Sequence, residues 1–66
     1  MRVAINGKEQ EIEAGITVAA LIAQYQLEPR HVAVEINYDL VTRSKYDSTT
    51  VKEGDQLEIV TLVGGG

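Results

Sequence analysis

The chain has no cysteine, phenylalanine or tryptophan, and it has one proline and one histidine among its 66 residues. The absence of cysteine excludes disulfides, thiolate zinc sites and iron–sulfur clusters, and a single histidine cannot build a metal cage. A chain of this length is enough for one small domain, which buries only about 60% of the surface that its unfolded state exposes. Its stability must therefore come from an aliphatic core, for which 19 leucine, isoleucine and valine residues are available.

Basic residues are also scarce, since six lysines and arginines against ten aspartates and glutamates give a net charge of −4. A nucleic-acid partner is not expected, because contacts to phosphates require clustered lysines and arginines. The longest uncharged apolar stretch, residues 16–27, is too short to span a bilayer, and no basic segment precedes a hydrophobic run. We therefore expect a cytoplasmic protein that binds neither nucleic acid nor membrane.

The first half of the sequence predicts a β-hairpin followed by a helix. Alternating side chains on both sides of the Asn-Gly pair at 6–7 predict a hairpin over residues 2–13, because Asn-Gly favours a type I′ turn. Thr17 is placed to cap a helix, and Pro29 ends that helix near residues 26–27. Four apolar side chains recur with helical spacing and are expected to face the core: Val18, Leu21, Ile22 and Tyr25.

Three more strands are predicted in the second half. Residues 31–36 alternate in the manner of a strand, residues 40–41 form a short edge strand, and residues 56–63 form the longest strand because they are rich in β-branched side chains. Residues 42–46 have no strand or helix period, so we expect a loop or a single helical turn. This order of elements favours an α+β domain in which a mixed sheet of four to five strands wraps around one helix, the β-grasp fold. A ferredoxin-like fold would need a second helix.

The body of the sequence contains no enzyme-like constellation. With one histidine, no cysteine and no glycine-rich loop between a strand and a helix, it has no nucleophile–base pair and no phosphate-binding loop. His31 is expected to be solvated, and Tyr38 and Tyr46 fall in predicted turns, where they serve either loop packing or contact with a partner. Three acidic side chains of the second strand are expected to form a solvated edge: Glu9, Glu11 and Glu13. We therefore predict no metal site and no catalytic residue in the body.

Half of the six glycines lie together as Gly64-Gly65-Gly66, directly after the last predicted strand. Three glycines reach roughly 10 Å when extended, and they carry no side chain that would obstruct a narrow channel. Glycine also adopts whatever backbone conformation such a channel imposes. A frayed end or a leftover linker would explain the same residues. We expect a domain over residues 1–63 and a flexible tail over residues 64–66 that can enter the active site of another protein.

Five segments of the chain resemble the ThiS family, and they occur in the same order as in that family. They are Asn6-Gly7-Lys8, Thr17-Val18, residues 32–37, residues 41–46, and the terminal block of residues 55–66, which is the most specific. Mild departures are threonine at 42 in place of a frequent proline, tyrosine at 46 in place of tryptophan, and isoleucine at 36 in place of a basic residue. ThiS proteins are sulfur carriers for thiazole formation in thiamin biosynthesis. The resemblance therefore implies a sulfur carrier with a ubiquitin-like β-grasp fold.

The same resemblance implies that the reactive group is the carboxylate of Gly66. In this family an E1-like adenylyltransferase of the ThiF type uses ATP and magnesium to adenylate the terminal glycine. A sulfur donor such as a cysteine desulfurase then supplies the sulfur of a thiocarboxylate, and a thiazole synthase of the ThiG type consumes it. The chain itself would bind no cofactor and would act as a cosubstrate rather than an enzyme. Gly65 shares the functional role by family, and Gly64 extends the reach.

Docking to such partners must come from the folded body. In the last strand Leu57, Ile59 and Thr61 are expected to face the helix, which places the alternate side chains on the outer face of the sheet. Three of these, near Ala33 and Ala4, are expected either to form a partner-docking patch or to pack under a loop: Glu58, Val60 and Leu62. Exposed apolar area of this kind indicates a partner surface.

Three other functions remain open at this point. One is the small subunit of molybdopterin synthase, although the short length and the terminal block favour the thiazole branch. Another is a ubiquitin-like modifier, which would be recovered as a larger conjugate through isopeptide bonds. The third is a β-grasp binding module that uses only its surface and would keep its activity without Gly65 and Gly66.

Overall fold

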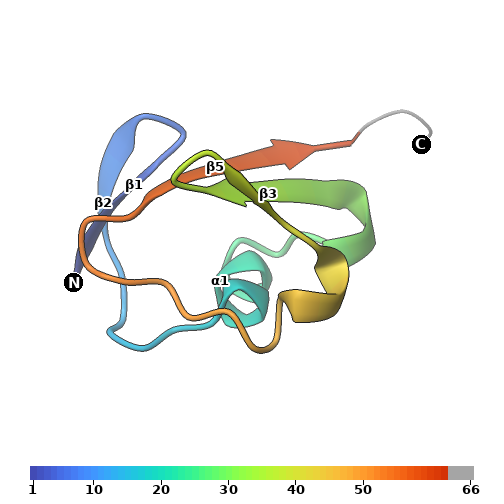
Figure 1. Cartoon of the computed structure of the whole chain (residues 1–66), viewed down its shortest axis with the longest axis horizontal. Helices are drawn as coiled ribbons and strands as arrows, with labels where there is room; N and C mark the ends of the chain where they lie inside the picture. The colour runs from blue at the N-terminus through green and yellow to red at the C-terminus, as the bar shows by residue number, and fades with distance from the viewer. Residues whose placement is uncertain (63–66) are drawn as a thin grey trace.

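Five strands and one α-helix are present in residues 1–62, the part of the chain that the computed structural model describes (Figure 1). They are β1 (Arg2–Ile5), β2 (Lys8–Glu11), α1 (Val18–Gln24), β3 (Val32–Ile36), β4 (Asp39–Val41) and β5 (Gln56–Thr61), with short 3-10 helices η1 (Pro29–His31) and η2 (Arg43–Lys45). The sheet order is β2-β1-β5-β3-β4; β1 and β5 are parallel and the other neighbours antiparallel. The predicted β-grasp fold is confirmed, whereas Val63 and the glycines at 64–66 lie outside the described residues.

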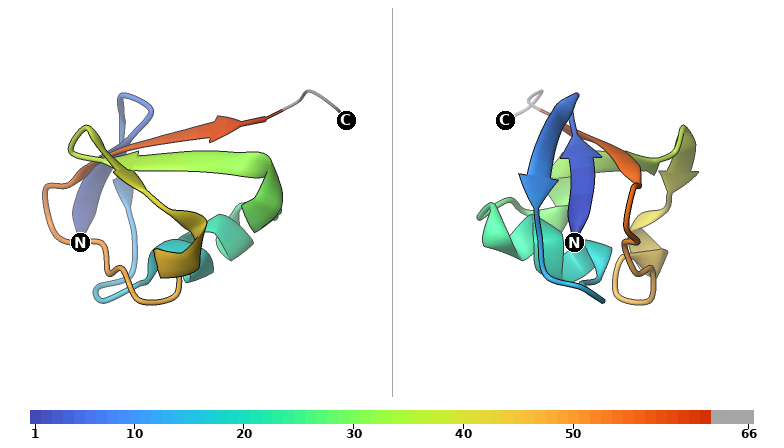
Figure 2. Two further views of the ribbon diagram at one scale, coloured as in Figure 1. Left: turned by 45° about the vertical axis from the view of Figure 1, so that its right-hand side comes forward. Right: turned by 90° about the vertical axis from the view of Figure 1, so that its left-hand side faces the viewer.

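The helix and the long connection between β4 and β5 lie on one side of the sheet (Figure 2). Thr17 caps the helix as predicted, because its hydroxyl accepts the N–H of Ala20 at 3.1 Å. The helix buries its apolar stripe against the inner face of the sheet. The resulting core consists of Val3, Ile5, Ile16, Val18, Leu21, Ile22, Val32, Val34, Tyr46, Val51, Leu57 and Ile59. Within residues 1–62 no helix or loop covers the other side of the sheet, called the outer face here.

Both hairpins turn on an asparagine with positive φ. Asn6 and Gly7 have φ values of 51° and 82°, and Asn37 and Tyr38 have φ values of 52° and 73°. Positive φ at both central residues is the type I′ geometry, whose twist matches that of the flanking strands. Gly7 adopts this conformation without steric cost, but Tyr38 carries a Cβ and is strained there. The second hairpin therefore uses a tyrosine where the turn favours glycine.

The two tyrosines in turns differ in their surroundings. Tyr46 is buried next to η2, and its hydroxyl donates to the carbonyl of Val32 at 3.4 Å, so it serves loop packing. Tyr38 is 83% exposed. We expected a loop or a single helical turn in residues 42–46, and the structure has the helical turn, η2. His31 is exposed as predicted, although it belongs to η1, and the strand begins one residue later at Val32.

The prediction that Tyr25 faces the core is wrong, because its side chain is 43% exposed. The helix ends at Gln24, and Tyr25 is its C-cap. Since β1 ends at Ile5, no strand accompanies β5 beside the tyrosine ring, and Tyr25 lines an open groove together with Leu27 and Thr61. Thr61, which we expected to be covered by the helix, is exposed for the same reason.

The helix ends in a Schellman motif that places Gln26 in the left-handed region. Its φ is 60°, its N–H donates to the carbonyl of Ala23 at 2.9 Å, and the N–H of Leu27 donates to the carbonyl of Ile22 at 3.1 Å. Glycine is favoured at this position because it has no Cβ. Gln26 at this position therefore lowers the stability of the domain relative to glycine.

We expect Gln26→Gly to raise the free energy of unfolding by about 0.5–1 kcal/mol, because relief of the left-handed strain exceeds the added entropy of the unfolded chain. In thermal denaturation this corresponds to an increase in Tm of about 2–8 °C. Ala23→Gly, at an exposed helical position, is the matched control and should lower stability by about 1 kcal/mol. An unchanged or lower Tm for Gln26→Gly would refute the assignment of strain to this residue.

Candidate functional site

β5 is the element that leads toward the terminal glycines, and it lies in the centre of the sheet (Figure 1). Up to Leu57 it is paired on both sides, with β1 and with β3. From there on β3 alone continues the ladder, which extends to the N–H of Leu62 bonded to the carbonyl of His31 at 2.6 Å. The strand is thus held through its last described residue. The predicted tail residues Gly64, Gly65 and Gly66 lie outside the described part.

Asn6 replaces the missing strand at the point where β1 ends. Its side chain accepts the N–H of Ile59 at 2.8 Å and donates to the carbonyl of the same residue at 3.1 Å. These two bonds satisfy the N–H and the carbonyl of Ile59, which no longer have a partner on β1, and both are partly buried. The sequence indicated Asn6 only as a turn residue. Its second role joins positions 53 residues apart, so no local pattern could have predicted it.

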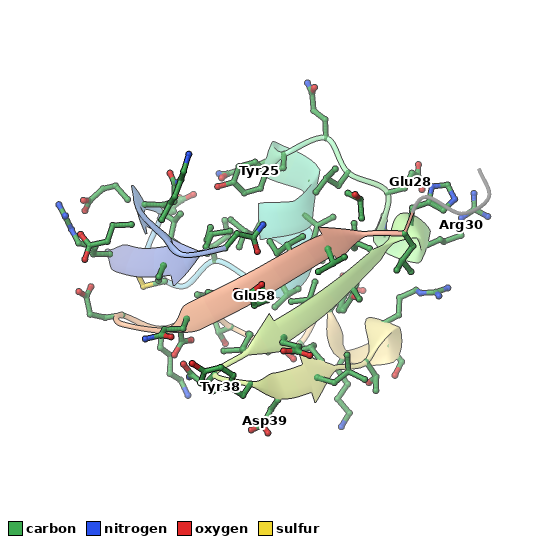
Figure 3. All side chains as sticks on the ribbon, turned by 90° about the horizontal axis from the view of Figure 1, so that it is seen from above. Tyr25, Glu28, Arg30, Tyr38, Asp39 and Glu58 are labelled. Carbon is green, nitrogen blue, oxygen red and sulfur yellow. The ribbon has the colours of Figure 1, made fainter. Side chains whose placement is uncertain are left out.

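The predicted docking patch, composed of Glu58, Val60 and Leu62, lies on the outer face of the sheet. Val60 and Leu62 are 52% and 54% exposed, and Glu58 projects from the middle of β5 (Figure 3). The ladder places Val60 opposite Ala33 of β3. These side chains therefore point outward and do not pack under a loop, whereas their docking role stays a prediction.

Further exposed side chains of this face lie on β4 and at its turn. Leu40 lies opposite Glu35 in the ladder and is 65% exposed. Tyr38, at the turn that joins β3 to β4, is also on this side of the domain (Figure 3). Glu35 lies between Leu40 and Glu58 in the ladder, so exposed apolar side chains alternate with carboxylates on this face. Exposed apolar side chains with polar neighbours are typical of a protein-binding face.

Two of the acidic residues predicted to be solvated take part in ion pairs. The guanidinium of Arg2 donates to Glu9 at 2.9 Å and to Glu11 at 3.2 Å. The hydrogen bond to Glu9, together with the negative charges of Glu11 and Glu9, raises the pKa of Arg2 above its ordinary value. Within residues 1–62 no three acidic or histidine side chains come together to hold a metal ion, and no helix there could cross a bilayer.

The family model described as the ThiS family matches residues 3–66, which is nearly the whole chain. The chain belongs to the ThiS family. It is 36% identical over 63 residues to the sulfur carrier protein ThiS of Bacillus subtilis, with 94% of this chain and 96% of that protein covered. The crystal structure of the thiamine biosynthesis protein (ThiS) from Geobacter metallireducens matches it with a TM-score of 0.85 and 32% identity, covering 100% of both chains.

ThiS-like sequence also occurs inside longer proteins. This ThiS-family chain is 44% identical over 66 residues to the thiazole synthase of Paramagnetospirillum magneticum, and it is 38% identical to that of Magnetococcus marinus. In both comparisons the whole chain is matched, and it covers 20% of the relative. The chain therefore spans about a fifth of the length of these two thiazole synthases. The family resemblance and the fold predicted from the sequence are both confirmed.

Proposed function

We propose that the chain is a sulfur carrier of thiamin biosynthesis whose reactive group is the carboxylate of Gly66. The observation that carries this proposal is the ThiS-family match over residues 3–66, because the matched region includes the terminal glycines. The likeness to the named sulfur carrier of Bacillus subtilis supports it. Membership in the ThiS family also favours the thiazole branch over the small subunit of molybdopterin synthase.

The chemistry requires activation of Gly66, because a carboxylate at neutral pH is a poor electrophile. An E1-like adenylyltransferase of the ThiF type transfers AMP from magnesium-bound ATP to one carboxylate oxygen and releases pyrophosphate. The terminal sulfur of a persulfide, carried by a donor such as a cysteine desulfurase, then attacks the carbonyl carbon, and AMP leaves with that oxygen. A thiol reductant cleaves the S–S bond of the resulting acyl disulfide and is itself oxidised to a disulfide. The product is a thiocarboxylate on Gly66. The catalytic groups belong to the partners, so the chain acts as a cosubstrate and not as an enzyme.

The body of the domain supports this role by fixing the place from which the tail leaves. The bond from Leu62 to His31 and the two bonds from Asn6 to Ile59 hold the end of β5 against its neighbours. Three glycines beyond the domain add up to roughly 10 Å of reach without side chains. A well-anchored strand followed by such a segment can present its terminal carboxylate deep inside a partner.

A thiazole synthase of the ThiG type is the proposed acceptor of the sulfur. Support comes from the two thiazole synthases that contain a segment similar to this chain. A sulfur carrier bears the thiocarboxylate that the thiazole synthase consumes. A ThiS-like segment within proteins named thiazole synthase therefore fits the proposal that such an enzyme is the acceptor. The sulfur then passes to the thiazole in exchange for one oxygen atom from the acceptor substrate or from water, which regenerates the carboxylate of Gly66.

The docking patch gives a prediction about the adenylation step. Val60→Glu combined with Leu62→Glu should raise KM for the carrier by about 10-fold or more, because buried apolar contacts at an interface are replaced by charges. The maximal rate and the Tm should change little, since both side chains are exposed in the free domain. The measurement is pyrophosphate release by the adenylyltransferase as a function of carrier concentration.

The matched control for this double variant is Ala20→Glu with Ala23→Glu. Both alanines are exposed on the helix, so the control adds the same two charges on the side of the sheet opposite the docking patch. Its KM should stay within about two-fold of wild type. If the double variant of the docking patch turned over like wild type at limiting carrier, the patch would have no role in adenylation.

The proposed modification can be read from the intact mass of the protein. Incubation with the adenylyltransferase, ATP, magnesium and a sulfur source should exchange one oxygen for one sulfur at Gly66. A ubiquitin-like modifier would instead appear as an isopeptide conjugate of larger mass. A plain binding module would remain at its starting mass.

A further inference from the structure

The outer face of the sheet carries two pairs of neighbouring carboxylates, and the structure shows how one of them is neutralised. Glu9 and Glu11 of β2 lie beside Arg2 of β1, whose guanidinium bridges them at 2.9 and 3.2 Å. All three side chains are more than half exposed. A planar guanidinium with several donors is well suited to bridge two carboxylates in this way.

The second pair, Glu35 of β3 and Glu58 of β5, has no such bridge. The two residues are directly opposite each other in the antiparallel ladder, and both project to the outer face. Like charges in directly opposed positions of a sheet destabilise it. Among residues 1–62 neither carboxylate is part of an ion pair; the pairs found there involve only the N-terminus, Arg2, Glu9 and Glu11. The folded domain therefore retains an unfavourable arrangement that an external cation would relieve.

An apolar and aromatic rim surrounds this second pair. Val60 flanks it along β5, and Leu40 lies opposite Glu35 on β4. Tyr38 and Glu58 line a small hollow of about 80 Å³ together with residues that include Ala4 and Gly7. Figure 3, which looks onto this face, shows Glu58 in the middle of β5 and Tyr38 at the end of the neighbouring hairpin.

Tyr38 is itself costly to the free domain. Its φ of 73° is unfavourable for a residue with a Cβ, and with 83% of the side chain exposed the ring gains little from packing. The first hairpin of the same chain uses glycine at the equivalent turn position, Gly7. An exposed tyrosine ring next to carboxylates is, however, a good surface for a guanidinium, which stacks on aromatic faces.

We propose that the outer face binds an arginine side chain of the adenylyltransferase, with its guanidinium between Glu35 and Glu58 as that of Arg2 lies between Glu9 and Glu11. This inference rests on the proposed function, and it specifies the chemistry of the surface that recognises the carrier. The methylene groups of the arginine and apolar residues next to it on the adenylyltransferase contact Val60 and Leu40. The ring of Tyr38 covers the hollow beside Glu58. Charge complementarity with a chain of net charge −4 also favours a basic partner surface.

Two other occupants fit the face less well. A second copy of the chain in a two-fold contact would bring its own Glu35–Glu58 pair against the first, which adds repulsion instead of relieving it. A divalent cation would need further oxygen ligands, and within the described residues no group of three acidic or histidine side chains surrounds this position. An arginine from a different protein satisfies both the charge and the apolar rim.

The test compares Glu35→Gln and Glu58→Gln with Glu13→Gln, which removes the same charge at an exposed position beyond the end of β2. Affinity for the adenylyltransferase is measured by calorimetry at low and high salt, and Tm by thermal denaturation. We expect each of the first two variants to bind about 10-fold more weakly, with a smaller salt dependence, because a hydrogen bond to a charged group is lost. Their Tm should rise by about 1–4 °C as the like-charge repulsion disappears. Glu13→Gln should change neither quantity.

The expected signature is weaker binding together with a more stable free domain, which a purely structural pair of glutamates would not give. Glu58→Arg should weaken binding further, by about 100-fold, while raising Tm because it creates a cross-strand pair with Glu35.

Wild-type affinity in both glutamine variants would overturn the inference, while sulfur gain at Gly66 would leave the proposed function intact. A wild-type chain that neither binds the enzyme nor gains sulfur would overturn both. A wild-type dimer in sedimentation that Val60→Glu dissociates would assign the face to a second copy.

Discussion

Gly65→Val is expected to reduce thiocarboxylate formation by about 100-fold or more while leaving the domain as stable as wild type. A β-branched side chain next to the reactive carboxylate obstructs a channel that accepts bare backbone, and it restricts the conformations that the backbone can adopt there. Displacement of a reacting group by about 1 Å is enough to cost about 100-fold in rate. The measurement is the rate of AMP transfer to the carrier, with Tm recorded on the same sample.

Gly65→Ala is the graded control for that variant, because it adds one carbon and keeps more backbone freedom than valine. We expect an intermediate loss, so that the rate falls in the order glycine, alanine, valine. Removing Gly65 and Gly66 together should abolish the reaction. Since the hydrophobic core lies within residues 3–59, none of these changes should shift Tm by more than about 1 °C. Equal rates for glycine and valine at position 65 would argue against entry of the tail into a narrow site.

Asn6→Ala is expected to lower the free energy of unfolding by about 2–5 kcal/mol. The substitution leaves the N–H and the carbonyl of Ile59 without their hydrogen-bond partner. It also places alanine, which has no polar side chain to form local hydrogen bonds, at a position with positive φ. A domain of this size has about 3–10 kcal/mol in total, so the variant should lose a large fraction of its stability. Urea denaturation of the purified protein measures the difference.

Two further substitutions separate the causes at this position. Asn6→Gly removes the two hydrogen bonds but tolerates the φ of 51°, so it should recover about 1 kcal/mol relative to alanine. Asn6→Asp keeps an acceptor for the N–H of Ile59 and loses only the donor to its carbonyl. It should therefore lie between wild type and glycine. A free energy for Asn6→Ala within about 0.5 kcal/mol of wild type would show that the side chain does not hold β5.

The parts of the fold that could be predicted from the sequence depend on local signals. The Asn-Gly turn, the Thr17 cap and the alternation within β5 each involve residues a few positions apart. The structure confirms the first two, and it confirms the alternation as far as Val60. The outward direction of Val60 and Leu62 follows from the same alternation. The order of these elements was then enough to indicate the β-grasp fold.

The parts that could not be predicted depend on where distant segments end or meet. Tyr25 has helical spacing, but its exposure follows from the early end of β1 at Ile5. The hydrogen bonds from the Asn6 side chain to Ile59 form because β5 extends beyond the end of β1, and no local pattern indicates this. The unpaired Glu35 and Glu58 become neighbours only through the register of β3 with β5. Tyr38 carried no signal for positive φ, because the turn that it occupies favours glycine.

The proposed reactive group of the chain is the terminal carboxylate of Gly66. The most direct test is the intact mass of the purified chain after incubation with a ThiF-type adenylyltransferase, ATP, magnesium and a sulfur donor, followed by fragmentation from the C-terminus. We predict a mass gain equal to the difference between one sulfur and one oxygen atom, confined to Gly66 and dependent on ATP. A gain located at any other residue, or an unchanged mass under conditions in which the enzyme modifies its own known carrier, would contradict the claim.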